Sequence, residues 1–326
     1  MPGYSKIIGT GSYFPEKILS NKDLEKLANT SDEWITSRTG IKERRIAENE
    51  TTSEMSYKAA IKALEMAETC ADDLDGIICA SLSQDTIMPS MACLLQDKFG
   101  VGGKTFAFDL LAACSGFLYA CAVADSMIKT GLGNKLLVIG AERMSPALDW
   151  NDRNTCILFG DGAGAAVIAS SDTPGFRSFY MRAHGGYGDF LAFPSLGSNY
   201  FANIDTWDLK TNMIHMKGNE LFKIAVKSMA EAADIAVKES GLSYEDIDCF
   251  VPHQANLRII DAAAKRIKID KEKVMITLDK YGNTSAASIP TTLDDAVRRG
   301  KIKKGDNVVS ASFGGGLTWA STCFTF

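Results

Sequence analysis

Cys114 lies in a run of small residues, Ala112-Ala-Cys-Ser-Gly116, that joins two apolar segments of different pattern. The segment before it, 105–111, is short and aromatic-rich, which is typical of a buried strand, whereas apolar residues from 117 to 128 recur at helical spacing. Unpaired backbone N–H groups and the dipole at a helix start favour a thiolate. Cys114 is therefore a candidate nucleophile, and a small buried packing residue is the alternative interpretation.

His253 is the histidine whose surroundings point to chemistry. It follows an apolar segment and a proline in Val251-Pro-His-Gln-Ala-Asn256, and side chains at strand ends commonly form the sites of α/β proteins. His184 and His215 lie in or beside an irregular stretch, and we interpret them as structural. Because no second histidine, cysteine or carboxylate stands at ligand spacing from His253, we expect no metal site.

The composition narrows the class of protein. The 326 residues include 35 basic and 40 acidic side chains, so a general nucleic-acid surface is not expected. We find no signal-peptide pattern and no stretch apolar enough to span a bilayer. Eight cysteines without a Cys-x-x-Cys pair indicate reduced thiols, and together these features predict a cytoplasmic globular protein without a membrane partner.

The elements that must position these residues follow from periodicity. Strands are predicted at 7–14, 135–140, 274–278 and 307–312, a turn into a buried strand at 72–80, and helices at 53–69 and 218–240. The glycine-rich run 160–166 leads into further apolar residues rather than a helix, which argues against a dinucleotide site. The stretch 172–216 is rich in Gly, Ser, Asn and aromatic residues, and it predicts a long excursion over the surface or over an active-site mouth.

The chain also contains an internal duplication. Two pairs of segments match position by position: 72–78 with 245–251, and 124–131 with 293–300. The second match has an offset of 169 residues, which places Cys114 opposite Asn283. We therefore predict two copies of one α/β unit, residues 1–171 with Cys114 and residues 172–326 with His253 and Asn283, which meet in a shared site.

Four motifs carry a resemblance to a known family. They are Ala112-Ala-Cys-Ser-Gly-Phe117, Val251-Pro-His-Gln-Ala-Asn256, Gly282-Asn-Thr-Ser-Ala-Ala-Ser288 and Phe313-Gly-Gly-Gly316. In order and spacing they resemble those of β-ketoacyl-[acyl carrier protein] synthase III of the thiolase superfamily, and the likeness extends from Gly9 to the C-terminus. The resemblance implies a thiolase-like five-layered α/β/α/β/α fold of two duplicated halves, assembled as a homodimer.

The resemblance also implies a reaction. Cys114 would accept an acyl group from an acyl-CoA primer, and malonyl-acyl carrier protein would then lose CO2 and condense with it, which begins type II fatty acid biosynthesis. His253 and Asn283 would donate hydrogen bonds to the enolate oxygen. The backbone N–H groups of Cys114 and Gly315 would form the oxyanion hole. No cofactor is implied, because the CoA thioester is the substrate.

The resemblance also implies binding roles for further residues. The residues that would bind CoA are Thr30, Trp34, Arg38, Arg153, Gly218, Phe222 and Asn256. The residues that would form the dock for the acidic carrier protein are Lys223, Arg258, Lys265 and Arg266, and a solvated helix face is the alternative for them. Met88 stands where many members carry Phe at the position that closes the partner subunit's primer pocket. A flexible thioether there leaves the preference among acetyl, branched and longer primers open.

Two other activities compete with this interpretation. A thioesterase or amidase would use the same Cys-His-Asn trio, with His253 as a base. A relative that makes a secondary metabolite would carry out the same chemistry for another pathway. Elongating relatives have a second histidine where this chain has Asn283, and true thiolases have a second cysteine near the glycine run at 314–316. The initiating, decarboxylating class therefore fits best.

Overall fold

Two sheets form the framework of the molecule. The computed structural model describes residues 3–194, 198, 208 and 212–326. The first sheet has the order β1-β7-β6-β4-β5, and its strands are β1 Tyr4–Tyr13, β4 Gly76–Ala80, β5 Phe106–Leu110, β6 Lys135–Glu142 and β7 Gly162–Ser171. The second has the order β11-β12-β13-β8, and its strands are β8 Phe176–Ala183, β11 Cys249–Pro252, β12 Asn307–Gly314 and β13 Thr318–Thr325.

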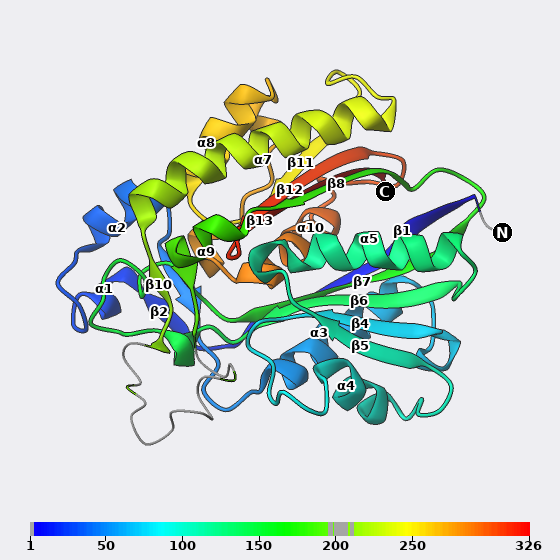
Figure 1. Ribbon diagram of the computed structural model, residues 1–326, viewed down its shortest axis with the longest axis horizontal. Coiled ribbons are helices and arrows are strands. Elements are labelled where there is room, and N and C mark those ends of the chain that lie inside the picture. Colours follow the sequence, from blue (N-terminus) through cyan, green and yellow to red (C-terminus); the bar gives the residue numbers. More distant parts are fainter. Residues whose placement is uncertain (1–2, 195–197, 199–207, 209–211) are drawn as a thin grey trace.

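Helices cover both sheets and fill the space between them (Figure 1). On the outer face of the first sheet lie α3 Thr52–Met66 and α4 Met91–Phe99, and on the outer face of the second lie α7 Gly218–Ser240 and α8 Leu257–Arg266. The central layer consists of α5 Gly116–Lys129 and α10 Ser288–Arg298. The expected five-layered α/β/α/β/α fold is confirmed.

Shorter elements border the site. They are β2 Ile18–Ser20, α1 Asn21–Leu24, α2 Asp32–Thr39, β3 Glu43–Arg45, β9 Leu191–Ala192, β10 His215–Met216 and α9 Leu278–Tyr281. Two single turns, Ala113–Ser115 and Ser285–Ala287, immediately precede the central helices α5 and α10. These turns therefore face the meeting point of the two halves.

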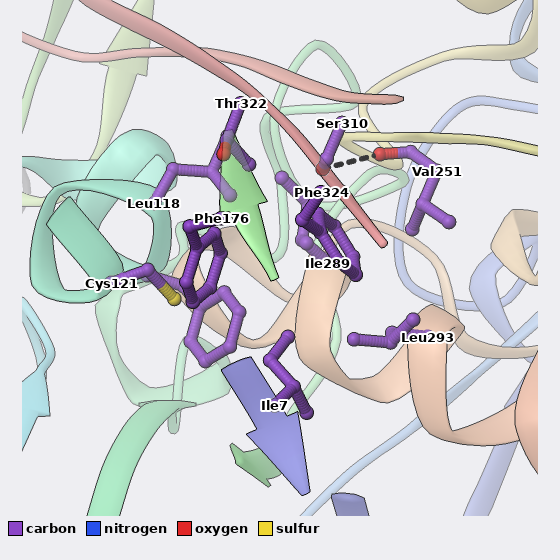
Figure 2. Close-up of a pocket in the computed structure, with 11 residues that line it drawn as sticks. Ile7, Leu118, Cys121, Phe176, Val251, Ile289, Leu293, Ser310, Thr322 and Phe324 are labelled. Atoms are coloured by element: carbon purple, nitrogen blue, oxygen red, sulfur yellow. Dashed lines mark hydrogen bonds between the residues drawn. The ribbon is translucent and has the colours of Figure 1, made fainter. Parts of the chain in front are cut away.

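The centre of the molecule is a packed apolar core. Side chains from both sheets and both central helices meet around a void of about 10 Å³, among them Ile7, Leu118, Phe176, Ile289 and Phe324 (Figure 2). Such a volume holds one water molecule at most. The core fixes the two halves against each other, and it is not a binding site.

Two predicted elements are wrong. The stretch 274–278 is not a strand: Val274 makes a single bridge to Phe250, and α9 begins at Leu278. The stretch 172–216, of which 195–197, 199–207 and 209–211 lie outside the described residues, is not wholly irregular, because it contains β8, which pairs along most of its length with β13. Antiparallel pairing to the last strand of the chain is a long-range contact, which the local composition of 172–216 does not reveal.

The predicted pairing of Cys114 with Asn283 is also wrong. The helices α5 and α10 begin 172 residues apart, at Gly116 and Ser288, and the turns before them are related by the same offset. The backbone counterpart of Cys114 is therefore Ala286. The offset of 169 applies where the helices end, because α10 has 11 residues and α5 has 14.

The boundary between the halves follows the sheets. All strands of the first sheet lie before residue 172, and all strands of the second lie after it. Both sheets nevertheless share the central helical layer (Figure 1). The division into units 1–171 and 172–326 stays a prediction.

Candidate active site

Cys114 occupies the turn between β5 and α5. Ala113 before it has a φ of 45°, a left-handed conformation that turns the chain sharply from the strand into the helix. The cysteine is 5% exposed, and the backbone N–H groups of Cys114 and Gly315 lie close enough to its sulfur to lower the pKa of the thiol. The two N–H groups assigned to an oxyanion hole thus lie at the sulfur.

The glycine run after β12 makes this approach possible. A Cβ atom on Gly314 would lie 2.6 Å from the backbone nitrogen of Cys114, so a larger residue would displace the cysteine turn. The two segments are also tied by hydrogen bonds. The Thr318 hydroxyl donates to the Ala112 carbonyl oxygen over 3.0 Å, and the Ser115 hydroxyl donates to the Thr318 carbonyl oxygen over 3.2 Å.

The segment 283–288 connects the three candidate catalytic residues. The backbone N–H of Ser285 donates to Asn283 Oδ1 over 2.8 Å, which leaves the Asn283 Nδ2 amide free to face a ligand. The Ser285 side chain lies beside Cys114, and Ser288 Oγ lies 2.6 Å from His253 Nδ1. His253 directly follows β11, as predicted. One short segment therefore holds the cysteine, the histidine and the asparagine in a single constellation.

Burial sets the charge state of this constellation. The pKa of Cys114 is raised to about 11, mainly by loss of solvation and also by the nearby Glu142, although the Ser285 hydroxyl beside the sulfur lowers it. Burial lowers the pKa of His253 to about 3, so the imidazole is neutral. The N–H groups near the helix start lower the pKa of the thiol, as expected, but desolvation outweighs them, so the thiol form is favoured in the free protein.

A cavity of about 580 Å³ opens beside Cys114. Its lining is mostly apolar and includes Leu82, Ile87, Leu111, Met144, Phe159, Leu191, Phe193 and Ile214. Residues from the stretch 172–216 thus form part of the active-site mouth, as predicted. Met88 does not line this cavity, and it is 86% exposed, next to the lining residue Ile87.

The candidate CoA residues form an aromatic and basic cluster on the surface. The guanidinium carbons of Arg38 and Arg153 lie 5.8 Å and 4.9 Å from the centre of the Trp34 ring. Asn256 caps α8, and its Nδ2 donates to the Arg38 carbonyl oxygen over 3.1 Å. The Thr30 hydroxyl is shielded from solvent and has no hydrogen-bond partner within the described ranges. The structure thus brings these five residues into one region.

The remaining candidates lie on α7 and α8. Gly218 is the first residue of α7, and Phe222 follows one turn later. The Arg258 guanidinium lies 5.7 Å from the centre of the Phe222 ring, which joins the two helices at this end. The candidate docking residues are all exposed: Lys223, Arg258, Lys265 and Arg266. Their position supports a surface role, and it leaves the solvated helix face as the alternative.

The sequence analysis missed three polar residues of the site. Ser285 and Ser288 lie inside a quoted motif, but only the fold shows that they hold Cys114 and His253. Glu142 ends β6 and is fully buried. The one signal for Glu142 in the sequence was its position at the end of an apolar strand. A charged residue there is usually exposed, so this position did not indicate a buried site residue.

The described residues contain neither a metal-binding cluster nor a membrane-spanning helix. No group of three or more His, Cys, Asp or Glu side chains there is arranged to hold a metal ion. None of the described helices combines the length and the apolar character that crossing a membrane requires.

Comparisons with known proteins identify the family. Residues 108–185 match the family model described as 3-Oxoacyl-[acyl-carrier-protein (ACP)] synthase III, and residues 237–326 match the model of its C-terminal part. Over 318 residues, 97% of this chain and 96% of the relative, the chain is 51% identical to Beta-ketoacyl-[acyl-carrier-protein] synthase III of Caldanaerobacter subterraneus subsp. tengcongensis.

Two solved structures extend this similarity. The 3-oxoacyl-[acyl-carrier-protein] synthase III of Aquifex aeolicus VF5 has a TM-score of 0.92 and 47% identity, with 99% of this chain and 100% of that chain covered. The priming β-ketosynthase of the R1128 polyketide pathway has a TM-score of 0.94 and 34% identity, with 100% and 97% covered. This chain belongs to the β-ketoacyl-[acyl-carrier-protein] synthase III family, the condensing acyltransferases that initiate fatty acid synthesis.

Proposed function

We propose that this chain, in the cytoplasm, transfers an acyl group from an acyl-CoA primer to Cys114 and condenses it with malonyl-acyl carrier protein. The observation that carries the proposal is the segment 283–288, which ties a nucleophile and two neutral hydrogen-bond donors together beside an apolar cavity. A covalent acyl intermediate divides one difficult step into two easier ones. The product is a 3-oxoacyl-acyl carrier protein, and CO2 is released.

The first half-reaction is acyl transfer to sulfur. The Cys114 thiolate attacks the thioester carbonyl carbon, and the developing oxyanion accepts hydrogen bonds from the backbone N–H groups of Cys114 and Gly315. Both N–H groups already point to the sulfur, which supports this role. The CoA thiol then leaves, and the acyl chain extends into the cavity of about 580 Å³.

The second half-reaction needs a neutral histidine. Loss of CO2 from the malonyl group leaves negative charge on the thioester oxygen as an enolate, which donors must stabilise. In this proposal Ser288 donates to Nδ1 across the 2.6 Å contact, so His253 carries its hydrogen on Nε2, and Asn283 presents Nδ2 because Oδ1 accepts from the Ser285 backbone. The enolate carbon then attacks the acyl-Cys114 carbonyl carbon, and the Cys114 sulfur leaves.

The substrate carriers bind outside this cavity. Trp34, Arg38 and Arg153 would hold the adenine and phosphate end of CoA through stacking and charge. The unpaired Thr30 hydroxyl would meet the pantetheine arm, with Gly218, Phe222 and Asn256 along the same path. Lys223, Arg258, Lys265 and Arg266 would receive the acidic carrier protein. No cofactor takes part, because CoA enters as a substrate.

A homodimer completes the primer pocket in this proposal. Within the described residues, β5 pairs with a neighbour on one side only, so its other edge is open to a second copy. Apolar side chains gather beside this edge: Ile87 is 56% exposed, Met88 86% and Leu111 72%. Pairing of two β5 edges would cover these side chains. Met88 would then reach the cavity of the partner subunit.

One assay tests the proposed function. Purified protein is incubated with acyl-CoA and malonyl-acyl carrier protein, and the products are separated by mass. We expect 3-oxoacyl-acyl carrier protein, together with an acyl adduct on Cys114 when malonyl-acyl carrier protein is omitted. Cys114→Ala should lose both, whereas Cys70→Ala, which removes an exposed thiol, should retain both. Release of free fatty acid without a ketoacyl product would instead indicate a hydrolase.

A further inference from the structure

Glu142 is a fully buried carboxyl group beside the nucleophile. Four donors point to its two oxygens. They are the Ser81 hydroxyl at 3.2 Å, the Leu82 backbone N–H at 3.1 Å, the Ser83 hydroxyl at 2.5 Å and the Ser285 hydroxyl at 3.0 Å. A carboxylate that accepts from four donors is satisfied as an anion. Nothing in the two half-reactions above uses this buried charge.

Ser285 lies between this carboxylate and Cys114. Its hydroxyl donates to Glu142 Oε1 over 3.0 Å, and the Ser285 side chain also lies beside Cys114, with which it lines the same cavity. Because the single Ser285 hydroxyl hydrogen points to Glu142, Ser285 Oγ is left as an acceptor on the side of the Cys114 thiol. The three groups thus form a continuous path for a proton.

The other charged groups around Glu142 have other partners. Arg143, the next residue in the chain, directs its guanidinium to the carbonyl oxygens of Ala47 and Glu48. Asp161 lies next to Gly162, the β7 residue paired with Glu142, and it accepts from Ala47 and Ser145. His253 is neutral and bound to Ser288. Among the described residues, Cys114 is the titratable group that this path connects to Glu142.

We propose that Ser285 and Glu142 accept the proton of the Cys114 thiol when the primer is transferred. The S–H bond breaks, the electron pair stays on sulfur, Ser285 Oγ receives the proton, and the original Ser285 proton passes to Glu142 Oε1. The thiolate then bonds to the acyl carbon, and CoA leaves as a thiolate. This thiolate takes a proton back from Ser285, which regains one from Glu142. The inference rests on the proposed acyl-Cys114 intermediate.

Charge conservation is the physical reason for this route. Ionising Cys114 alone would place a second negative charge beside the Glu142 carboxylate in a buried site, which is costly. Internal transfer keeps one negative charge in the site throughout. Burial also raises the pKa of Glu142 to about 7, which brings the carboxylate closer in basicity to the thiolate.

The test is a comparison of Glu142→Gln with Ser81→Ala. Glu142→Gln removes the proposed proton acceptor, whereas Ser81→Ala removes one of its hydrogen-bond donors and leaves the path through Ser285 intact. The rate of acyl-Cys114 formation from acyl-CoA is measured in a single turnover by intact mass from pH 5.5 to 9.5. We expect Glu142→Gln to acylate about 100-fold more slowly at pH 8, since a positioned base contributes roughly this much. We expect Ser81→Ala to stay within about threefold of the wild type.

The pH profile separates a proton acceptor from other roles. Only the ionised carboxylate can accept a proton, so wild-type acylation should rise as pH increases through about 7, and this step should vanish in Glu142→Gln. If Glu142 merely raised the thiol pKa by its charge, Glu142→Gln would acylate faster than the wild type below pH 7. If it served packing alone, the step near pH 7 would persist. Either result would overturn the inference.

A second measurement tests whether Glu142→Gln disturbs the whole active site rather than acylation alone. Each variant is loaded by long incubation with acyl-CoA, and condensation with malonyl-acyl carrier protein is then followed. We expect Glu142→Gln to condense within about threefold of the wild type, because this step does not begin from the thiol. An equal loss in both half-reactions would contradict the inference. Failure of the proposed function is distinct, because the wild type itself would then form no acyl-Cys114.

Discussion

The two turns that precede the central helices have the same backbone and different chemistry. Each turn opens with a non-glycine residue in the left-handed conformation, Ala113 at φ 45° and Ser285 at φ 49°. The second position is Cys114 in one turn and Ala286 in the other. The duplicated fold thus has two equivalent turns at the centre of the molecule. We call Ala113–Ser115 the first corner and Ser285–Ala287 the second corner. One corner carries the nucleophile, and the other carries the hydroxyl that binds it.

The comparison shows what a duplicated fold leaves free to diverge. The conformation of the corner depends on the sharp change from strand or loop to buried helix, and both halves need it. The side chains at the corner do not pack identically, because Ser285 Oγ reaches Cys114 and Glu142 whereas the methyl group of Ala113 makes no hydrogen bond. Backbone geometry is therefore common to both halves, and reactivity belongs to one.

The largest effect is expected when the nucleophile is moved from the first corner to the second. We expect the double variant Cys114→Ala, Ala286→Cys to form no acyl adduct, although the new thiol occupies the equivalent backbone position. At position 286 the thiol would lack Gly315, which supplies an N–H only to the first corner. Intact mass after incubation with acyl-CoA measures the adduct, and circular dichroism checks that the variant is folded. An adduct on the thiol introduced at position 286 would show that the corner alone suffices.

A smaller loss should follow from removing one donor opposite the nucleophile. We expect Asn283→Ala to slow decarboxylative condensation about 100- to 1000-fold, because one donor to a developing oxyanion contributes about 3–4 kcal/mol. Acylation of Cys114 should change little, since the Asn283 amide is assigned to the enolate. Stopped reactions that quantify acyl-enzyme and ketoacyl product separately measure both steps. Equal slowing of both would assign Asn283 to positioning of the whole segment.

Local patterns in the sequence predicted one corner better than the other. The strand, turn and helix around Cys114 are adjacent in the chain, so small residues and periodicity sufficed. The second corner follows the short helix α9, and α10 is three residues shorter than α5, so the alignment through the helix ends placed Asn283 in the wrong register. Tertiary packing sets the lengths of α5 and α10, and the match between the two repeated segments does not reveal that these lengths differ.

Long-range contacts explain the other residues that were missed. Glu142 lies 143 positions from Ser285, and the buried hydrogen bond between them appears only when the two halves are assembled. The strand β8 was missed because its pairing partner is the last strand of the chain. The end of a strand indicated His253 and the repeat indicated Asn283, whereas the catalytic roles of both residues came from the motif resemblance.

The close approach of the glycine run to the first corner can be tested by adding one methyl group. We expect Gly314→Ala to destabilise the fold by about 1–3 kcal/mol, because the new Cβ would lie 2.6 Å from the Cys114 nitrogen. The matched control is Gly102→Ala, where a Cβ meets nothing within 4 Å. Urea unfolding of both variants measures the difference. A Gly314→Ala protein as stable as the control would show that the turn yields easily.

The smallest expected effect concerns the outer end of the site, where the two halves also meet. Arg153 lies 4.9 Å from the Trp34 ring centre in the first half, and Asn256 of the second half binds the same cluster through Arg38. We expect Arg153→Ala to raise KM for acyl-CoA about 3- to 10-fold, the value of a partly exposed cation-π and charge contact. The maximal rate should stay unchanged, because this contact does not reach the reacting atoms.

The control for this prediction uses both a second variant and a second substrate. Arg177→Ala removes an exposed arginine that binds Thr325 on the second sheet, and it should leave KM for acyl-CoA unaltered. Acyl-pantetheine lacks the adenine and phosphate end, so wild type and Arg153→Ala should use it equally well. If Arg153→Ala were impaired with acyl-pantetheine as well, the arginine would support the loop that contains it rather than bind the nucleotide.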